Sequence, residues 1–228
     1  MKIINLKEVD STMNVVKNYD FNTLVVAEKQ TLGRGKDERV WVSEKSNNIY
    51  MSILINANNE KINYFNYSFL SAISILKTIE VLTNGNVNLK VKWPNDVLIN
   101  NKKFCGILLE KDGNKLIIGI GINVDNYPEN VLFNASSLKK EGINLEKTDI
   151  INKFVEIFEK FSNKLQNTNN FEEIRQIWLN YAYNLEKNIK ISGKNEIEGI
   201  FKDLDNEGSL IVEDENGKIH KIFSGDIF

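Results

Sequence analysis

The chain has 228 residues, of which 42% are hydrophobic and 26% are charged, and its formal net charge is −2 at pH 7. Its lysines are interspersed with acids and no apolar run approaches a membrane span, which argues against DNA and membrane partners and for a cytoplasmic globular protein. A single cysteine, Cys105, and a single histidine, His220, exclude an internal disulfide and a Cys/His metal cluster.

The first third of the chain alternates short strands with two helices. Asp10, Ser11 and Thr12 offer N-cap side chains to a short helix, and apolar residues from Phe69 to Ile79 recur at three- and four-residue spacing, as in a core-packing helix. We expect strands over residues 1–6, 24–27 and 49–55, and helices over residues 11–17 and 65–82.

The remaining elements predict a meander, two helices and a group of hairpins. Thr148 and Asn170 are expected to cap two amphipathic helices that lie on a sheet face. After about residue 185 the sequence changes to short alternating segments separated by Gly and Asn, which predicts a small β-barrel. The strands of the meander are expected over residues 88–92, 97–99, 104–110 and 116–123, and those of the barrel over residues 189–191, 197–204, 210–213 and 219–223.

A glycine-bearing loop, Gly33-Arg34-Gly35-Lys36-Asp37-Glu38-Arg39-Val40-Trp41, contains two of only three arginines in the chain, against 26 lysines. Guanidinium meets phosphate or carboxylate through two parallel hydrogen bonds, and the glycines let the backbone approach a ligand closely. The loop therefore predicts an anion site. The alternative is a solvated hairpin tip, because charge runs are usually solvated.

A second cluster, Lys92-Trp93-Pro94-Asn95-Asp96, presents two polar side chains in a stiff turn beside a strand. The aspartate can orient a cation or an amine, although an Asx turn is the ordinary interpretation of such a pair. Downstream, Lys103 has the pattern of a solvated turn lysine and Cys105 that of a buried, inert thiol. Gly119 and Gly121 leave space above a strand, either for a close backbone or for a flat ligand.

Together these residues resemble biotin protein ligase, the family also called holocarboxylase synthetase. The resemblance covers essentially the whole chain and includes Ser11-Thr12, the glycine-arginine loop, residues 92–96, residues 135–138 and the closing Gly225-Asp226-Ile227. It implies an α+β fold: a mixed β-sheet catalytic domain packed with helices, like class II aminoacyl-tRNA synthetases, over residues 1–185, and an SH3-like barrel over residues 186–228. It also implies ATP-dependent biotinylation, through biotinyl-5'-AMP and with Mg²⁺, of a lysine on a biotin carboxyl carrier domain.

The resemblance also assigns roles to individual positions. It implies catalytic roles for Lys103, Asp96 and Arg34, and Asp96 as a magnesium ligand. The residues implied for biotin are Ser11, Thr12, Gln30, Gly33, Arg34, Lys103, Gly106, Gly119 and Gly121. Those implied for ATP and the adenylate are Arg34, Gly35, Lys36, Arg39, Trp41, Asn95, Asp96, Lys103 and Asn123.

Three positions depart from the family pattern. Met13 stands where asparagine is common, Lys36 replaces an arginine, and Glu38 replaces a glycine, which adds a Cβ and a negative charge near the phosphates. We expect weaker retention of the adenylate. Since the catalytic pattern begins at Ile3, we also expect a monofunctional ligase without a DNA-binding domain.

Two other functions remain open from the sequence. A lipoate or octanoate ligase or transferase would use Cys105 as an acyl carrier, in which case its pKa should be depressed. A biotin-binding sensor would have lost adenylation through the altered loop. We further expect the loop of residues 34–39 to order only over the adenylate, and a strand such as residues 49–55 to be an exposed edge that pairs with the carrier or with a second copy in a homodimer.

Overall fold

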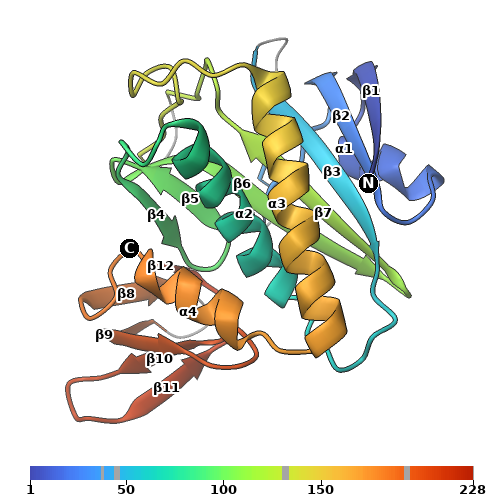
Figure 1. The fold of residues 1–228 in the computed structure, drawn as a ribbon. Helices are drawn as coiled ribbons and strands as arrows, with labels where there is room; N and C mark the ends of the chain where they lie inside the picture. Colours follow the sequence, from blue (N-terminus) through green and yellow to red (C-terminus); the bar gives the residue numbers. More distant parts are fainter. Residues whose placement is uncertain (37–38, 44–46, 130–133, 193–195, 228) are drawn as a thin grey trace.

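The computed structural model describes residues 1–36, 39–43, 47–129, 134–192 and 196–227. Two sheets and four α-helices account for most of them (Figure 1). The first sheet has seven strands in the order β1-β2-β3-β7-β6-β5-β4. Its strands are β1 (Lys2–Val9), β2 (Thr23–Gln30), β3 (Ile49–Asn56), β4 (Leu89–Lys92), β5 (Asp96–Ile99), β6 (Lys102–Asp112) and β7 (Lys115–Ile122).

The first sheet is mixed, as predicted. Strands β1 and β2 run parallel, whereas β2–β3, β3–β7 and the meander β4–β5–β6–β7 are antiparallel. The expectation that residues 49–55 form an exposed edge is wrong, because β3 lies between β2 and β7 and its first seven residues are buried. The edges are β1 and β4, and the backbone of residues 181–183 hydrogen-bonds to Val91 on β4.

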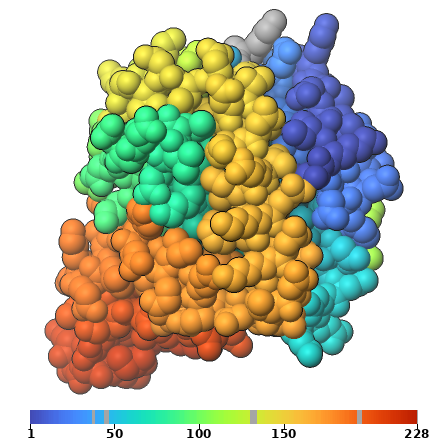
Figure 2. Space-filling view, viewed as in Figure 1, coloured from blue at the N-terminus to red at the C-terminus, as the bar shows by residue number. Residues whose placement is uncertain are grey.

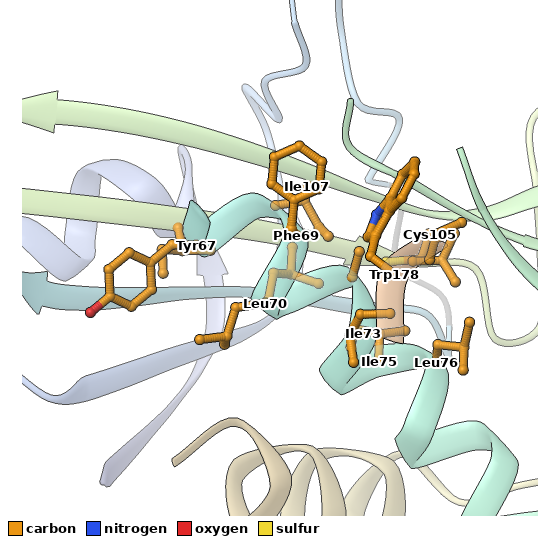
Figure 3. Packing of buried hydrophobic residues seen from close by; sticks show 14 of the residues in the cluster. Tyr67, Phe69, Leu70, Ile73, Ile75, Leu76, Cys105, Ile107 and Trp178 are labelled. Carbon is orange, nitrogen blue, oxygen red and sulfur yellow. The ribbon is translucent and has the colours of Figure 1, made fainter. Parts of the chain in front are cut away.

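The two faces of this sheet are covered by different elements. Helices α2 (Asn66–Leu82) and α3 (Lys147–Thr168) cover one face and form the main core, part of which Figure 3 shows. On β7, Ile118 and Ile120 point into this core. Ile117 points to the opposite face, where a smaller cluster packs beneath α1 (Thr12–Val15) and the 3₁₀ turn η1 (Val16–Asn18). Since side chains alternate along a strand, Gly119 and Gly121 belong to the same face as Ile117.

Two predicted helix caps are displaced by one or two residues. The N-cap of α3 is Glu146 rather than Thr148, and that of α4 (Glu172–Asn180) is Phe171 rather than Asn170. Asn170 still accepts a hydrogen bond from the backbone of Glu172, as an N-cap side chain does, although it lies one residue before the assigned N-cap. Helix α4 packs against α2 and the second sheet instead of on a face of the first.

The second sheet is antiparallel, with five strands in the order β11-β10-β9-β8-β12. It forms a lobe that remains in contact with the helices of the larger part (Figure 2). Its strands are β8 (Asn188–Ser192), β9 (Ile197–Leu204), β10 (Leu210–Glu213), β11 (Ile219–Ile222) and β12 (Asp226–Ile227). The α+β class with a C-terminal β domain is thus confirmed, while the domain division after residue 185 stays a prediction. None of the described helices is long and apolar enough to cross a membrane.

Candidate functional site

A cavity of about 110 Å³ lies on the face of the first sheet that carries the glycines of β7. The start of α1, the end of β2, the loop of residues 33–41, strands β5 to β7 and β12 all contribute to its wall. It collects nearly every site residue predicted from the sequence: Ser11, Thr12, Gln30, Arg34, Gly35, Lys36, Arg39, Trp41, Asn95, Asp96, Lys103, Gly106, Gly119 and Gly121. Gly33 lies beside this wall, within contact distance of Trp41, Ser43 and Gln30.

One end of the cavity is a network of uncharged polar groups. Ser11 is the N-cap of α1, so its side chain accepts a hydrogen bond from the backbone of Met13. Thr12 donates to Gln30 Oε1 through both its backbone nitrogen, at 2.8 Å, and its hydroxyl, at 3.0 Å. The same hydroxyl lies 2.7 Å from the buried Ser52 Oγ. Alternating donors and acceptors of this kind suit a small amide or urea group.

The floor of the cavity is a pair of glycines facing each other across β6 and β7. The register pairs Asp96 with Gly106 and Gly106 with Gly121, so these residues form one row across three strands. A Cβ on Gly106 would come within 2.7 Å of the Trp41 ring, and one on Gly121 within 2.6 Å of Trp41 Nε1. The indole therefore lies directly on the glycine pair, and a side chain at either glycine would require the ring to move.

Trp41 and Met13 complete the apolar walls. The Trp41 Nε1 atom is buried and has no hydrogen-bond partner among the described residues. Met13 is buried, and its sulfur would lie 2.6 Å from a Cβ on Gly119. Trp41, which the resemblance assigns to the nucleotide, lies against Gly106 and Gly121, two of the positions assigned to biotin, and its contact with the nucleotide stays a prediction. Its unpaired N–H is available to a ligand acceptor.

The opposite end of the cavity holds a lysine and an aspartate in close contact. Lys103 Nζ lies 2.6 Å from Asp96 Oδ1, and both side chains are about one-fifth exposed. That carboxylate oxygen nevertheless lacks an aligned hydrogen-bond donor among the described residues. The contact is therefore an ion pair, and the oxygen can still accept a hydrogen bond or bind a cation. The Lys103 ammonium also lies 5.7 Å from the centre of the Trp41 ring.

The turn before Asp96 is held rigidly. Asn95 donates from Nδ2 to the carbonyl of Ile107 at 2.6 Å, and the indole of Trp93 donates to the carbonyl of Gly208 at 3.1 Å. The Trp93–Pro94 peptide bond is cis. Asn95 lines the cavity and uses one Nδ2 hydrogen on the sheet, so its side-chain Oδ1 and its second Nδ2 hydrogen are the groups that it can offer to a ligand.

Each loop cation of the cavity is paired with an acid. Arg34 binds Glu110 through two nitrogens, with Nη1 to Oε1 at 2.7 Å, and donates to Asn14 Oδ1 at 2.9 Å. Its Nε is buried without a hydrogen-bond partner in the described part of the chain. Lys36 and Arg39 both pair with Asp226 of β12. The cations that line the cavity are therefore already neutralised by carboxylates in the structure.

Asn123 and Cys105 lie near the site, but the contacts that they make are within the protein. Asn123 is absent from the cavity wall, and its side chain donates to the carbonyl of Ser136 at 3.1 Å, which supports the segment that bridges to Lys103 at Ala135. Its predicted contact with adenine stays a prediction. Cys105 is fully buried, and burial raises the pKa of its thiol, as expected for an inert cysteine rather than an acyl carrier.

Several residues of the site were not predicted from the sequence. Ser52 carried a signal, because it is the one serine in the otherwise hydrophobic strand of residues 49–55. Asp226 belongs to the closing Gly-Asp-Ile segment, to which no role had been given. Glu110 and Ser43 carried no local signal, since their contacts with the cavity residues Arg34 and Gln30 depend on strand register and on the path of the loop. Glu38 lies outside the described residues.

Comparisons with known proteins agree over both parts of the chain. Residues 6–126 match the Biotin/lipoate A/B protein ligase family and residues 185–228 match the Biotin protein ligase C terminal domain. The chain is 35% identical over 216 residues to "Bifunctional ligase/repressor BirA" of Bacillus spizizenii, with 90% of this chain but 65% of that protein covered. It thus spans just under two thirds of that relative's length.

A relative of similar size and a solved structure cover more of both chains. "Biotin--[acetyl-CoA-carboxylase] ligase" of Paracoccus denitrificans is 28% identical over 206 residues, which is 85% of each chain. The structure of the Aquifex aeolicus biotin protein ligase in complex with biotin and ATP superimposes with a TM-score of 0.88 at 30% identity, and the match covers 100% of this chain and 97% of that one.

Proposed function

The chain belongs to the biotin/lipoate A/B protein ligase family, and we propose that it is a biotin protein ligase that attaches biotin to a carrier lysine at the expense of ATP. One observation carries the proposal: a single cavity joins the Thr12–Gln30 polar network to the Lys103–Asp96 pair over a glycine floor. A ligand with a urea-like head, a flat body and a carboxylate tail fits that order of groups.

In the first half-reaction, a biotin carboxylate oxygen attacks the α-phosphorus of ATP. The new P–O bond forms as the bond to pyrophosphate breaks, and biotinyl-5'-AMP remains in the cavity. Negative charge must be brought together at the attacking and leaving oxygens, so a fixed cation lowers the barrier. Lys103 is the cation at this end of the cavity, and we assign it to the carboxylate and the α-phosphate.

A magnesium ion fits the residues at this end. Mg²⁺ prefers one or two carboxylates together with phosphate oxygens and water. Asp96 Oδ1, buried and without an aligned donor among the described residues, is a suitable single protein ligand. The described part of the chain holds no cluster of three acidic, His or Cys side chains that could bind a metal by itself. The ion would neutralise phosphate charge; Asp96 would hold it once Lys103 turns to the substrate.

In the second half-reaction, a carrier lysine amine attacks the carbonyl carbon of the mixed anhydride. The C–N bond forms, the bond to the adenylate oxygen breaks, AMP leaves, and the ammonium formed on the new amide nitrogen loses a proton. Asp96 is the nearest carboxylate at the Lys103 end, and we assign it to orienting the incoming amine. This step needs no further cofactor.

For the partner, we propose a biotin carboxyl carrier domain of a biotin-dependent carboxylase. Support comes from the printed name of the Paracoccus relative, which places acetyl-CoA carboxylase as its substrate. A cytoplasmic location and assembly as a homodimer stay predictions from the sequence. Light scattering of the purified chain, with and without biotin and ATP, measures the oligomeric state directly.

The deciding experiment is exchange of labelled pyrophosphate into ATP with magnesium and biotin, octanoate, lipoate or no acid. We expect exchange with biotin alone. Biotin binding without exchange would instead indicate a sensor, and exchange with octanoate or lipoate would overturn the substrate assignment. With exchange established, transfer of labelled biotin to a carrier domain tests the second half-reaction.

A further inference from the structure

The segment Gly225-Asp226-Ile227 reaches the cavity from the second sheet. Strand β12 pairs with β8, Asp226 opposite Ser192 and Ile227 opposite Ile191, and Ile227 is buried. Ile227 thus anchors the segment, while the side chain of Asp226 lines the cavity. The mechanism above uses no residue of this sheet.

The contacts of this segment converge on the loop cations. Lys36 donates to the Gly225 carbonyl at 2.9 Å, and its Nζ lies 3.4 Å from Asp226 Oδ1. Arg39 Nη2 donates to the other carboxylate oxygen, Asp226 Oδ2. Two cations three residues apart on the loop are therefore held by one backbone carbonyl and both oxygens of one carboxylate.

The geometry of Gly225 fixes where this carbonyl points. Its φ is +151°, and a Cβ there would lie 2.8 Å from both Ile191 Cγ2 and Ser192 O, so only glycine fits against β8. On the loop side, the stem is closed by backbone hydrogen bonds from Gly35 to Arg39 and from Trp41 to Gly33. The Gly225 backbone is thus fixed by its contact with β8, and the loop stem is closed by its own backbone hydrogen bonds.

Asp226 is anionic at neutral pH. Burial raises the pKa of its carboxyl group, but the hydrogen bond from Arg39 and the positive charge of Lys36 outweigh burial, and the net pKa lies below its usual value. The side chain is about one-third exposed, at 32%, so solvent and salt weaken the pair without abolishing it. The two carboxylate oxygens of Asp226 present the two cations with an arrangement like that of two oxygens of one phosphate group.

We propose that Asp226 is a positioning residue for adenylation: it holds Lys36 and Arg39 at the mouth of the cavity, so that nucleotide phosphates meet pre-placed cations. The inference rests on the proposed function and extends it by making the second sheet part of the nucleotide site. Pre-placed cations spare the ligand the ordering of two long side chains, which is a recognised cost of binding. The opposite role, a competitor that phosphate must displace, is an outcome of the test.

The test compares Asp226→Asn, Asp226→Ala and Asp226→Glu in the full chain by pyrophosphate exchange at varied ATP and varied biotin. Because two partly exposed ion pairs are lost, we expect the KM for ATP to rise about three- to tenfold in the Asn and Ala variants. The KM for biotin and the thermal midpoint should change little, and Asp226→Glu should recover part of the loss.

A matched control comes from the same sheet. Asp203 of β9 pairs with Arg175 of α4, so it also links the second sheet to the first part of the chain through an arginine, away from the cavity. Asp203→Asn should leave the KM for ATP unchanged even if it lowers the thermal midpoint. In an Arg39→Met, Lys36→Met background, the effect of Asp226→Asn should disappear.

Four results would separate the possibilities. A lower KM for ATP in Asp226→Asn means that the carboxylate competes with phosphate, and an unchanged KM means that it does not act on the nucleotide; either overturns the inference. Equal losses in Asp203→Asn and Asp226→Asn would show a merely structural role. Absence of biotin-dependent exchange in the unmodified chain would instead refute the proposed function.

Discussion

At the scale of single residues, the Lys103–Asp96 pair is the point at which the ligand-free cavity differs from the proposed reacting state. The ammonium must leave a carboxylate 2.6 Å away to reach the substrate carboxylate and phosphate. A compact ammonium can turn between partners in this space, whereas a planar guanidinium is fixed by its fork geometry. The identity of the cation, and not its charge alone, should therefore matter.

We predict that Lys103→Met lowers the rate of pyrophosphate exchange by about 100- to 1000-fold, as for loss of one preorganised stabilising group. Lys103→Arg should recover only a small part of that loss. The neighbouring Lys102→Met is the control: Lys102 lies on the same strand, pairs with Glu141 and does not line the cavity, so its exchange rate should remain near that of the unmodified chain. Similar losses at both positions would contradict the assignment.

The glycine floor gives a second prediction at this scale. In Gly121→Ala the new methyl group meets the Trp41 ring within 2.6 Å, so the indole must move away from the floor. We expect the KM for biotin to rise at least about tenfold, the effect of roughly 1.4 kcal/mol of lost binding. Isothermal titration with biotin alone provides an independent measure of the affinity.

The double variant Gly121→Ala, Trp41→Leu distinguishes the cause. If the indole collision drives the loss, shortening residue 41 should make the two changes non-additive. Strictly additive losses would mean that the methyl group obstructs the ligand itself.

Site residues could be predicted from the sequence where the local composition was unusual or where the chain contained a stiff turn. Two of the three arginines marked the loop, and the tryptophan-proline turn marked Asp96. Ser52 stood out as a serine in an apolar strand, but its contact with Thr12, like the place of Asp226 in the cavity wall, depends on segments far apart in the sequence. Met13 stood beside the predicted Ser11-Thr12 pair, but its contact with Gly119 depends on how α1 crosses β7.

At the scale of elements, the segment of residues 134–143 is a polar support beside Lys103. The backbone of Lys103 pairs with Asn134 and Ser136, and Glu141 gathers side-chain hydrogen bonds from Asn100, Ser136 and Lys102. Burial raises the pKa of Glu141, but these three donors outweigh it and hold the pKa at about 2.

The lowered pKa makes this support sensitive to acid. The unfolded carboxyl titrates near 4.5, so the stabilisation is fully present above that pH and is lost as the pH falls towards 2. We predict that Glu141→Gln lowers the free energy of unfolding at pH 7, and that the gap from the unmodified chain closes between pH 4.5 and 2. Urea unfolding at several pH values measures the gap; one that stays constant would contradict the prediction.

Helices and strands that follow from local periodicity were predicted more accurately than the pairing of strands from distant parts of the chain. The meander from β4 to β7 follows from turn residues between successive strands, and α2 follows from its apolar spacing. The parallel pairing of β1 with β2 and the interior place of β3 depend on contacts between distant segments. Residues 49–55 are apolar apart from Ser52, yet such a run does not specify which strands lie beside it, and the predicted exposed edge proved to be a buried strand between β2 and β7.

At the scale of the whole molecule, the two sheets share one hydrophobic core. Trp178 of α4 contacts Phe69 of α2 with ring centres 5.5 Å apart and Phe201 of β9 at 6.4 Å, and Figure 3 shows Trp178 beside the residues of α2. The indole of Trp93 adds a hydrogen bond to the carbonyl of Gly208, in the turn between β9 and β10. A nucleotide site that includes Asp226 requires this docking to be stable.

We predict that the two sheets unfold as one cooperative unit and that Trp178 couples them. In native-state hydrogen exchange, amides of β9 should be as protected as those of β7, since both would open only on global unfolding. Trp178→Ala leaves a large cavity between α2 and β9, so the free energy of unfolding should fall by about 3–5 kcal/mol.

The same substitution should expose β9 and β10 to exchange before β6 and β7. Trp178→Phe, which keeps an aromatic ring in the space, should retain most of the coupling. If β9 already exchanges far faster than β7 in the unmodified chain, the second sheet opens on its own, and the contacts of Asp226 would then hold the loop only while that sheet is docked.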